Sequence, residues 1–213
     1  MRTGRDLSPL LEEAPGDGPR PPYLSPTLPG LVAVAWLVVA AALLAQSAYL
    51  NALTVTAVVA SGLAGVFSLF WLQRAYRNLS ALGVAELRDS PLSAALWFVV
   101  PVANWLLTYP VLSDLWRLSD RSDPQGLSQR RPLLVQAWWL CWAAPPVISI
   151  LSLLFFERPG PGSAGDRAQA LVSVDFAFLA AAAVLAAAII LGVNARQAAS
   201  HRTQPAEGDD AGL

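Results

Sequence analysis

The sequence predicts an all-α membrane protein with four transmembrane helices and one proline-broken segment that is re-entrant or interfacial. Of the 213 residues, 55% are hydrophobic and only 14% are charged, whereas soluble domains usually carry about 25% charged residues. The charges are also unevenly spread, because four stretches contain no Asp, Glu, Lys or Arg: 21–73, 90–113, 132–156 and 176–195. Crossing a bilayer takes about 20 mostly apolar residues, so these stretches supply the spans.

The first uncharged stretch is long enough for a helical hairpin. We expect spans at about 30–48 and 52–72, joined by a very short turn. Residues 1–29 are rich in Pro, with Gly and acidic residues between them. Such a segment buries too little apolar surface to offset its ordering entropy, so we predict a disordered tail.

Two more spans are expected at 133–156 and 171–193. They complete a helical transmembrane domain over residues 30–195. The polar residues 196–213 end in Glu207, Asp209 and Asp210, and this composition predicts a second disordered tail.

Residues 93–115 are apolar, but prolines interrupt them. Pro101 and Pro110 are each expected to break a helix, and Asn104 places an amide beside the first break. Short apolar runs are more often re-entrant or interfacial than spanning. The alternative is a fifth span.

The distribution of arginine discriminates between four and five spans, because cytoplasmic loops carry the excess of basic residues. All 14 basic residues are Arg. With four spans and a cytoplasmic N-terminus, Arg158 and Arg167 lie outside and the other 12 lie inside. Five spans would move the basic segment 117–131 outside. We therefore predict a multi-pass protein of the cell membrane with both termini cytoplasmic.

The middle of the chain carries an ordered set of aromatic, basic and proline residues. They are Trp71-x-x-Arg74-x-x-Arg77-Asn78, Gly83, Ser90-Pro91, Trp97-Phe98-Val99-Val100-Pro101-Val102-x-Asn104, Pro110, Trp116-Arg117-x-Ser119 and Trp138-Trp139-x-x-Trp142. This order resembles the bacterial membrane family named domain of unknown function 4328, over roughly residues 31–196. The resemblance implies a multi-pass membrane protein of bacterial origin and implies no activity.

The chemistry available to the chain is narrow. No HExxH, GxSxG or P-loop motif occurs, and the single histidine, His201, lies in the predicted tail. We expect no enzymatic activity, no metal and no cofactor. A net charge of −1 gives no reason to expect a nucleic-acid partner.

One basic and aromatic group is the candidate head-group or partner site: Arg74, Arg77, Asn78, Trp97, Pro101, Asn104, Trp116 and Arg117. Guanidinium groups suit phosphate oxygens, and basic pockets at the cytoplasmic ends of spans hold lipid head groups. We expect the three arginines to converge near the break at Pro101. The simpler interpretation is that they snorkel and fix topology, with the tryptophans as interface anchors.

Asp175 is an acid inside the last predicted span, which makes it a functional hypothesis by default, with interface capping as the alternative. Two functions follow. The first is a non-catalytic membrane protein that binds lipids, a protein partner or a second copy of itself. The alternative is a small transporter or channel subunit that uses the broken segment and Asp175 as a polar path.

Overall fold

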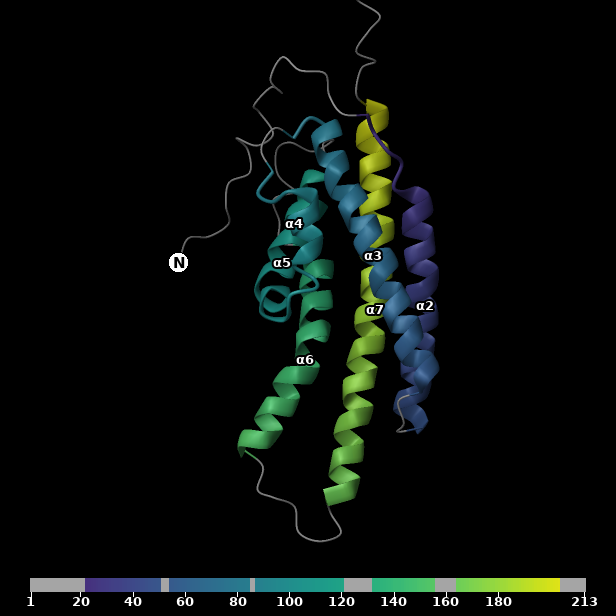
Figure 1. The fold of residues 1–213 in the computed structure, drawn as a ribbon, viewed down its shortest axis with the longest axis vertical. Coiled ribbons are helices and arrows are strands. Elements are labelled where there is room, and N and C mark those ends of the chain that lie inside the picture. The colour runs from purple at the N-terminus through teal and green to yellow at the C-terminus, as the bar shows by residue number, and fades with distance from the viewer. Residues whose placement is uncertain (1–21, 51–53, 85–86, 121–131, 156–163, 204–213) are drawn as a thin grey trace, which may run out of the picture. The chain divides into compact units, whose positions relative to one another are not determined.

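The computed structural model describes residues 22–50, 54–84, 87–120, 132–155 and 164–203, and all regular secondary structure in them is α-helical (Figure 1). The helices are α2 (Thr27–Leu50), α3 (Val55–Ala81), α4 (Pro91–Leu96), α5 (Pro101–Leu118), α6 (Leu133–Phe155) and α7 (Ala164–Thr203). The all-α fold class is confirmed.

Among the residues that the structure describes, four helices are long and apolar enough to cross a membrane. They are α2, α3, residues Leu133–Ser152 of α6 and residues Gln169–Thr203 of α7. The four-span prediction is therefore confirmed, and α4 and α5 are not among the candidate spans.

The chain divides into two compact units, which share α3 and α7 between them. Unit 1 comprises residues up to Leu28, Trp71–Pro132 and the chain from Gly192 onward. Unit 2 comprises Pro29–Phe70 and Leu133–Leu191. Unit 2 therefore holds most of the apolar helix length, and unit 1 holds α4, α5 and the polar ends of α3 and α7.

In unit 2, small side chains let helices pack closely. Ala57, Ala60 and Ala64 on α3 are buried, and the Trp36 ring of α2 stacks on the Phe67 ring of α3 with centroids 6.3 Å apart. Helix α6 contains Pro145 and Pro146, each of which removes a backbone hydrogen bond, and it bends in its second half (Figure 1).

In unit 1, the predicted break at Pro101 is confirmed, because α4 ends at Leu96 and α5 begins at Pro101. The predicted break at Pro110 is wrong, since α5 continues through this residue to Leu118. A proline removes one intrahelical bond, and the burial of Val111, Leu112 and Leu115 on the next turns holds the helix together across that gap.

Two predicted boundaries are also corrected. Helix α2 begins at Thr27, inside the predicted tail 1–29, and residues 1–21 of that tail lie outside the described residues. Helix α7 continues to Thr203, so the tail predicted at 196–213 is wrong for residues 196–203. The reason is tertiary: Gln197 and Ser200 are buried and hydrogen-bonded within unit 1. Residues 204–213 lie outside the described residues.

Candidate functional site

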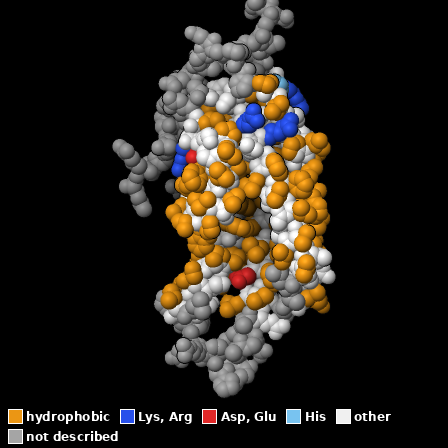
Figure 2. All heavy atoms as spheres, in the orientation of Figure 1, with side chains coloured by type: hydrophobic (Ala, Val, Ile, Leu, Met, Phe, Trp, Pro, Cys, Tyr) orange, Lys and Arg blue, Asp and Glu red, His pale blue; other side chains and the backbone are white. Residues whose placement is uncertain are grey.

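Charged side chains gather in unit 1. Its described residues contain Arg74, Arg77, Arg88, Arg117, Arg196 and Arg202, against Asp89, Asp114 and Asp120. Among the side chains that the structure describes in unit 2, Asp175 is the charged one. On the face drawn in Figure 2, hydrophobic side chains predominate and most of the visible arginines lie together. Charged residues that could bind a ligand therefore lie mainly in unit 1.

The Asn78 side chain ties the chain before α2 to α3. The Leu24 N–H donates to Asn78 Oδ1 at 3.1 Å, and Asn78 Nδ2 donates to the Leu24 carbonyl at 2.8 Å. The same Nδ2 donates to Gln197 Oε1 at 3.2 Å. Asn78 is 1% exposed, and these bonds use both amide hydrogens and the amide oxygen. It is committed to holding the fold and is not free to bind a ligand.

Gln197 connects three helices from a fully buried position. Its Nε2 donates to the Ala75 carbonyl of α3 at 2.8 Å and to Ser119 Oγ, just after α5, at 3.2 Å. One turn further along α7, Ser200 Oγ donates to the Ser119 carbonyl at 3.0 Å. Buried polar groups lose free energy unless they are paired, so this network specifies how α3, α5 and α7 pack within unit 1.

Trp116 is held between two groups of α7. The Arg196 guanidinium lies over its ring, 4.1 Å from the centroid, and Arg196 Nη1 lies 3.5 Å from Asp120 Oδ2. On α7, a Cβ added to Gly192 would lie 2.6 Å from the Trp116 ring. Only a residue without a side chain permits this approach. The guanidinium that stacks on Trp116 therefore belongs to Arg196, which lay outside the predicted site.

Two further contacts hold the last turns of α7 in place within unit 1. Trp71 Nε1 donates to Asn194 Oδ1 at 2.8 Å in a buried position. The Tyr23 ring stacks on His201, with centroids 4.1 Å apart and an interplanar angle of 14°. Burial raises the pKa of the Tyr23 hydroxyl. The C-terminal turns of α7 are thus fastened to both α3 and the chain before α2.

The predicted arginines occupy three different environments. Arg74 Nε donates to the Leu24 carbonyl at 3.4 Å, Arg77 is exposed, and Arg117 is half-buried with its Nε enclosed and without a hydrogen-bond partner. The predicted convergence at Pro101 is wrong for Arg117. Because α5 is one helix, Arg117 lies about 24 Å along its axis from Pro101 at about 1.5 Å per residue.

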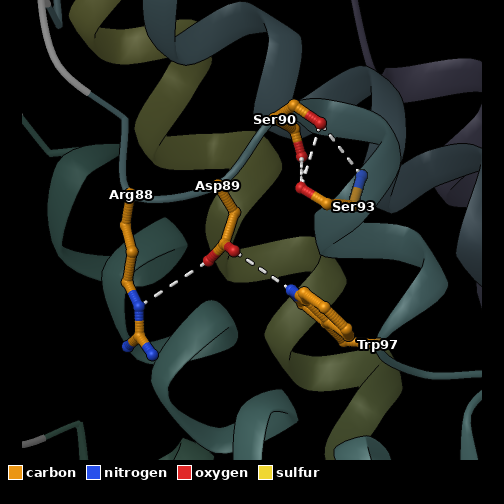
Figure 3. A network of polar contacts seen from close by, with 5 residues as sticks. All are labelled: Arg88, Asp89, Ser90, Ser93 and Trp97. Atoms are coloured by element: carbon orange, nitrogen blue, oxygen red, sulfur yellow. Dashed lines mark hydrogen bonds and ion pairs between the residues drawn. The ribbon is translucent and has the colours of Figure 1, made fainter.

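Trp97 belongs to a small network at the entry to α4 (Figure 3). Its Nε1 donates to Asp89 Oδ1 at 3.0 Å, and Arg88 Nε lies 3.8 Å from Asp89 Oδ2. Ser90 caps α4 by accepting from the Ser93 N–H at 3.1 Å. These contacts satisfy an N-cap and a charge pair, so they account for Trp97 structurally.

Pro101 and Asn104 lie at the other end of α5. Pro101 is exposed and is the first residue of the helix. The Asn104 N–H donates to the Val100 carbonyl at 2.7 Å, while its Oδ1 is enclosed and without a partner. The candidate site therefore separates into a tip, with Pro101 and Asn104, and a basic end, with Trp116 and Arg117.

Asp175 lies in unit 2, on the spanning part of α7. Its carboxylate lies near the Ser149 side chain of α6, and its Oδ1 is enclosed and without a partner. A polar path and capping at the interface both stay predictions for this residue.

The residues that sequence reasoning missed lie on the last turns of α7: Asn194, Arg196, Gln197 and Ser200. Their spacing was the available signal, because Asn194, Gln197 and Ser200 recur every three residues and so lie along one side of a helix. This spacing was overlooked because the polar composition of residues 196–213 indicated a disordered tail.

Among the described residues, four helices are long and apolar enough to cross a membrane, and most charged residues lie in unit 1; these features define an integral membrane protein. The model of the family "Domain of unknown function (DUF4328)" matches residues 37–195. The chain belongs to this family, as the resemblance implied. No curated protein and no solved structure matches the chain.

Proposed function

We propose that this integral membrane protein binds anionic lipid head groups through arginines of unit 1 and has no enzymatic activity. The observation that carries the proposal is an excess of unpaired positive charge. Among the described residues, Arg74, Arg77, Arg117 and Arg202 make no ion pair, whereas Arg88 and Arg196 each contact an aspartate. A phosphate group would supply the missing counter-charge.

Arg117 is the central residue of this proposal. Its Nε is enclosed without a hydrogen-bond partner, although a guanidinium has five N–H donors that favour bidentate contacts with phosphate oxygens. Leaving a buried charged donor unsatisfied costs free energy. A head-group phosphate would contact the exposed part of this half-buried guanidinium and supply its missing counter-charge.

The path of the chain supports a single membrane face for these arginines. If each candidate span crosses once, the start of α2, the end of α3, the start of α6 and the end of α7 lie on the same side. The described segments of unit 1 attach at those four ends. The arginine excess favours a cytoplasmic position for this side, where the leaflet is anionic. Both termini are therefore proposed to be cytoplasmic, and the membrane is the cell membrane.

Native mass spectrometry tests the proposal with full-length protein in mixed anionic and zwitterionic lipid. Arg74, Arg77 and Arg117 are replaced together by Gln, and in a second variant by Lys. Each arginine near an anionic leaflet contributes about 1 kcal/mol, so the triple Gln variant should retain anionic lipid about a hundredfold more weakly. The triple Lys variant should be intermediate, because lysine lacks the planar fork.

Arg88→Gln is the matched control, because Arg88 lies in the same unit but is paired with Asp89. It should retain anionic lipid like the wild type. Equal retention by the wild type and both triple variants would leave the three arginines as topology determinants only. The same spectra report a co-purifying protein partner or a second copy of the chain.

The second candidate function is a small transporter or channel subunit. The observation that favours it is the Asp175 carboxylate, which lies on a candidate span and has one enclosed oxygen without a hydrogen-bond partner. Ionisable groups in spans often mark ion or proton paths. Flux into proteoliposomes that is lost in Asp175→Asn would favour this function, and lipid retention without flux would favour the first.

A further inference from the structure

The α4–α5 hairpin of unit 1 has an apolar tip. Residues 90–113 contain no charged residue, and large side chains on the tip are exposed, with Val102 at 72% and Leu106 at 69%. Leu92, Leu96, Val99 and Val100 are also large exposed apolar residues of the hairpin. Soluble proteins rarely expose so many neighbouring apolar side chains to water.

The hairpin base, in contrast, is polar. Arg88 and Asp89 precede it, and Asp114, Arg117 and Asp120 end it. Charge at the base and apolar residues at the tip are the pattern of a segment that enters hydrocarbon from one side and returns to the same side.

Contacts inside unit 1 give the direction of the tip. Trp116 lies against Gly192 of α7, and three residues later Ser119 pairs with Gln197. Moving forward along α5 is therefore moving forward along α7, so the two helices run in the same sense. Since α7 leaves its span in that sense, the beginning of α5 points back toward the membrane.

The length of α5 is comparable to the thickness of one leaflet of the bilayer. Trp116 is level with Gly192 and Arg196, and Arg196 is the first charged residue after the last apolar stretch. Val102 lies about 21 Å from Trp116 along the helix axis. The hydrocarbon core is about 30 Å thick, so α5 is long enough to pass its midplane and too short to cross it.

The turn at the tip is also suited to hydrocarbon, where unpaired backbone groups are costly. Pro101 has no N–H. The four preceding N–H groups are paired within the hairpin: Trp97 to Ser93 at 3.0 Å, Phe98 to Ala95 at 3.2 Å, Val99 to Leu96 at 2.9 Å and Val100 to Leu96 at 3.2 Å.

From these observations we infer that residues 92–106 form a re-entrant hairpin whose tip contacts lipid acyl chains, inserted from the membrane face on which unit 1 lies. The inference goes beyond head-group binding, because it concerns contact with hydrocarbon. It selects a re-entrant hairpin over the two alternatives, an interfacial segment and a fifth span.

Depth-dependent fluorescence quenching tests the inference in liposomes. Single cysteines carrying an environment-sensitive dye are placed at Val102 and Leu106 in a Cys141→Ser background, since Cys141 is the sole cysteine. Val184→Cys, exposed on the spanning part of α7, is the hydrocarbon control. Thr203→Cys, exposed at the end of α7, is the aqueous control. If the Ser background unfolds, Cys141→Ala replaces it.

The expected result is that deep acyl-chain nitroxides quench Val102 and Leu106 as they quench Val184, and that an impermeant maleimide fails to label them from either side. Quenching at Val102 that is strongest with head-group nitroxides would overturn the inference in favour of an interfacial segment. Labelling of Val102 from the face opposite Thr203 would overturn it in favour of a fifth span. Neither outcome depends on whether the arginines bind lipid.

Discussion

Replacing Gly192 with Ala is expected to destabilise unit 1, although alanine ordinarily favours a helix over glycine by about 1 kcal/mol. The new Cβ would lie 2.6 Å from Trp116 Cζ3 and 2.7 Å from Cη2. The indole cannot yield freely, because the Arg196 guanidinium lies over its ring at 4.1 Å from the centroid. Overpacking of this kind costs about 1–3 kcal/mol.

A weakened cation–π contact adds about 0.5–1 kcal/mol to that cost. After the gain from helix propensity, the net destabilisation is about 0.5–3 kcal/mol. Thermal unfolding in detergent, followed by circular dichroism, measures it. Gly65→Ala on α3 is the matched control, because a Cβ there has no atom within 4 Å, and it should raise the melting temperature.

A second variant identifies the cause. Trp116→Leu in the Gly192→Ala background shortens the clashing side chain and should recover part of the lost stability. If Gly192→Ala raises the melting temperature as much as Gly65→Ala does, the close approach of Trp116 to α7 is refuted.

Three further outcomes are expected. Gln197→Leu leaves the Ala75 carbonyl without its donor and should destabilise unit 1 by about 2 kcal/mol in thermal unfolding; unchanged stability would contradict the buried network. Asn78→Leu should speed hydrogen exchange at the Leu24 amide, which loses its acceptor, and unchanged exchange would show that the chain before α2 is held by other contacts. Asp175→Leu should insert normally but unfold at lower temperature than Asp175→Asn, which keeps a polar group near Ser149; a Leu variant as stable as the wild type would make Asp175 dispensable.

The spans were predictable because hydrocarbon imposes a strong local rule on composition. Uncharged stretches of sufficient length located all four candidate spans, and Pro101 marked the division between α4 and α5. The ends of α3 and α7 were not predictable in the same way. Arg74 and Arg196 end the apolar runs, yet both helices continue, because Asn78 and Gln197 bury their amides against distant backbone.

The candidate site was only partly predictable for a related reason. Sequence reasoning grouped residues by type and proximity along the chain, and it placed Trp116 and Arg117 together in the candidate site. The partner of Trp116 is Arg196 on α7, and no local pattern connects residues so far apart. The helix break predicted at Pro110 does not occur, because burial of the following turns outweighs the hydrogen bond that a proline removes.

The topology of the chain tests the central claim most directly, since both the lipid site and the re-entrant hairpin require the segments of unit 1 to share one membrane face. Reporter fusions at the N-terminus, after Arg131, within residues 160–165 and at the C-terminus measure it. The four-span account predicts an outside signal only from the fusion within residues 160–165. An outside signal after Arg131 would contradict it, because residues 93–115 would then cross the membrane.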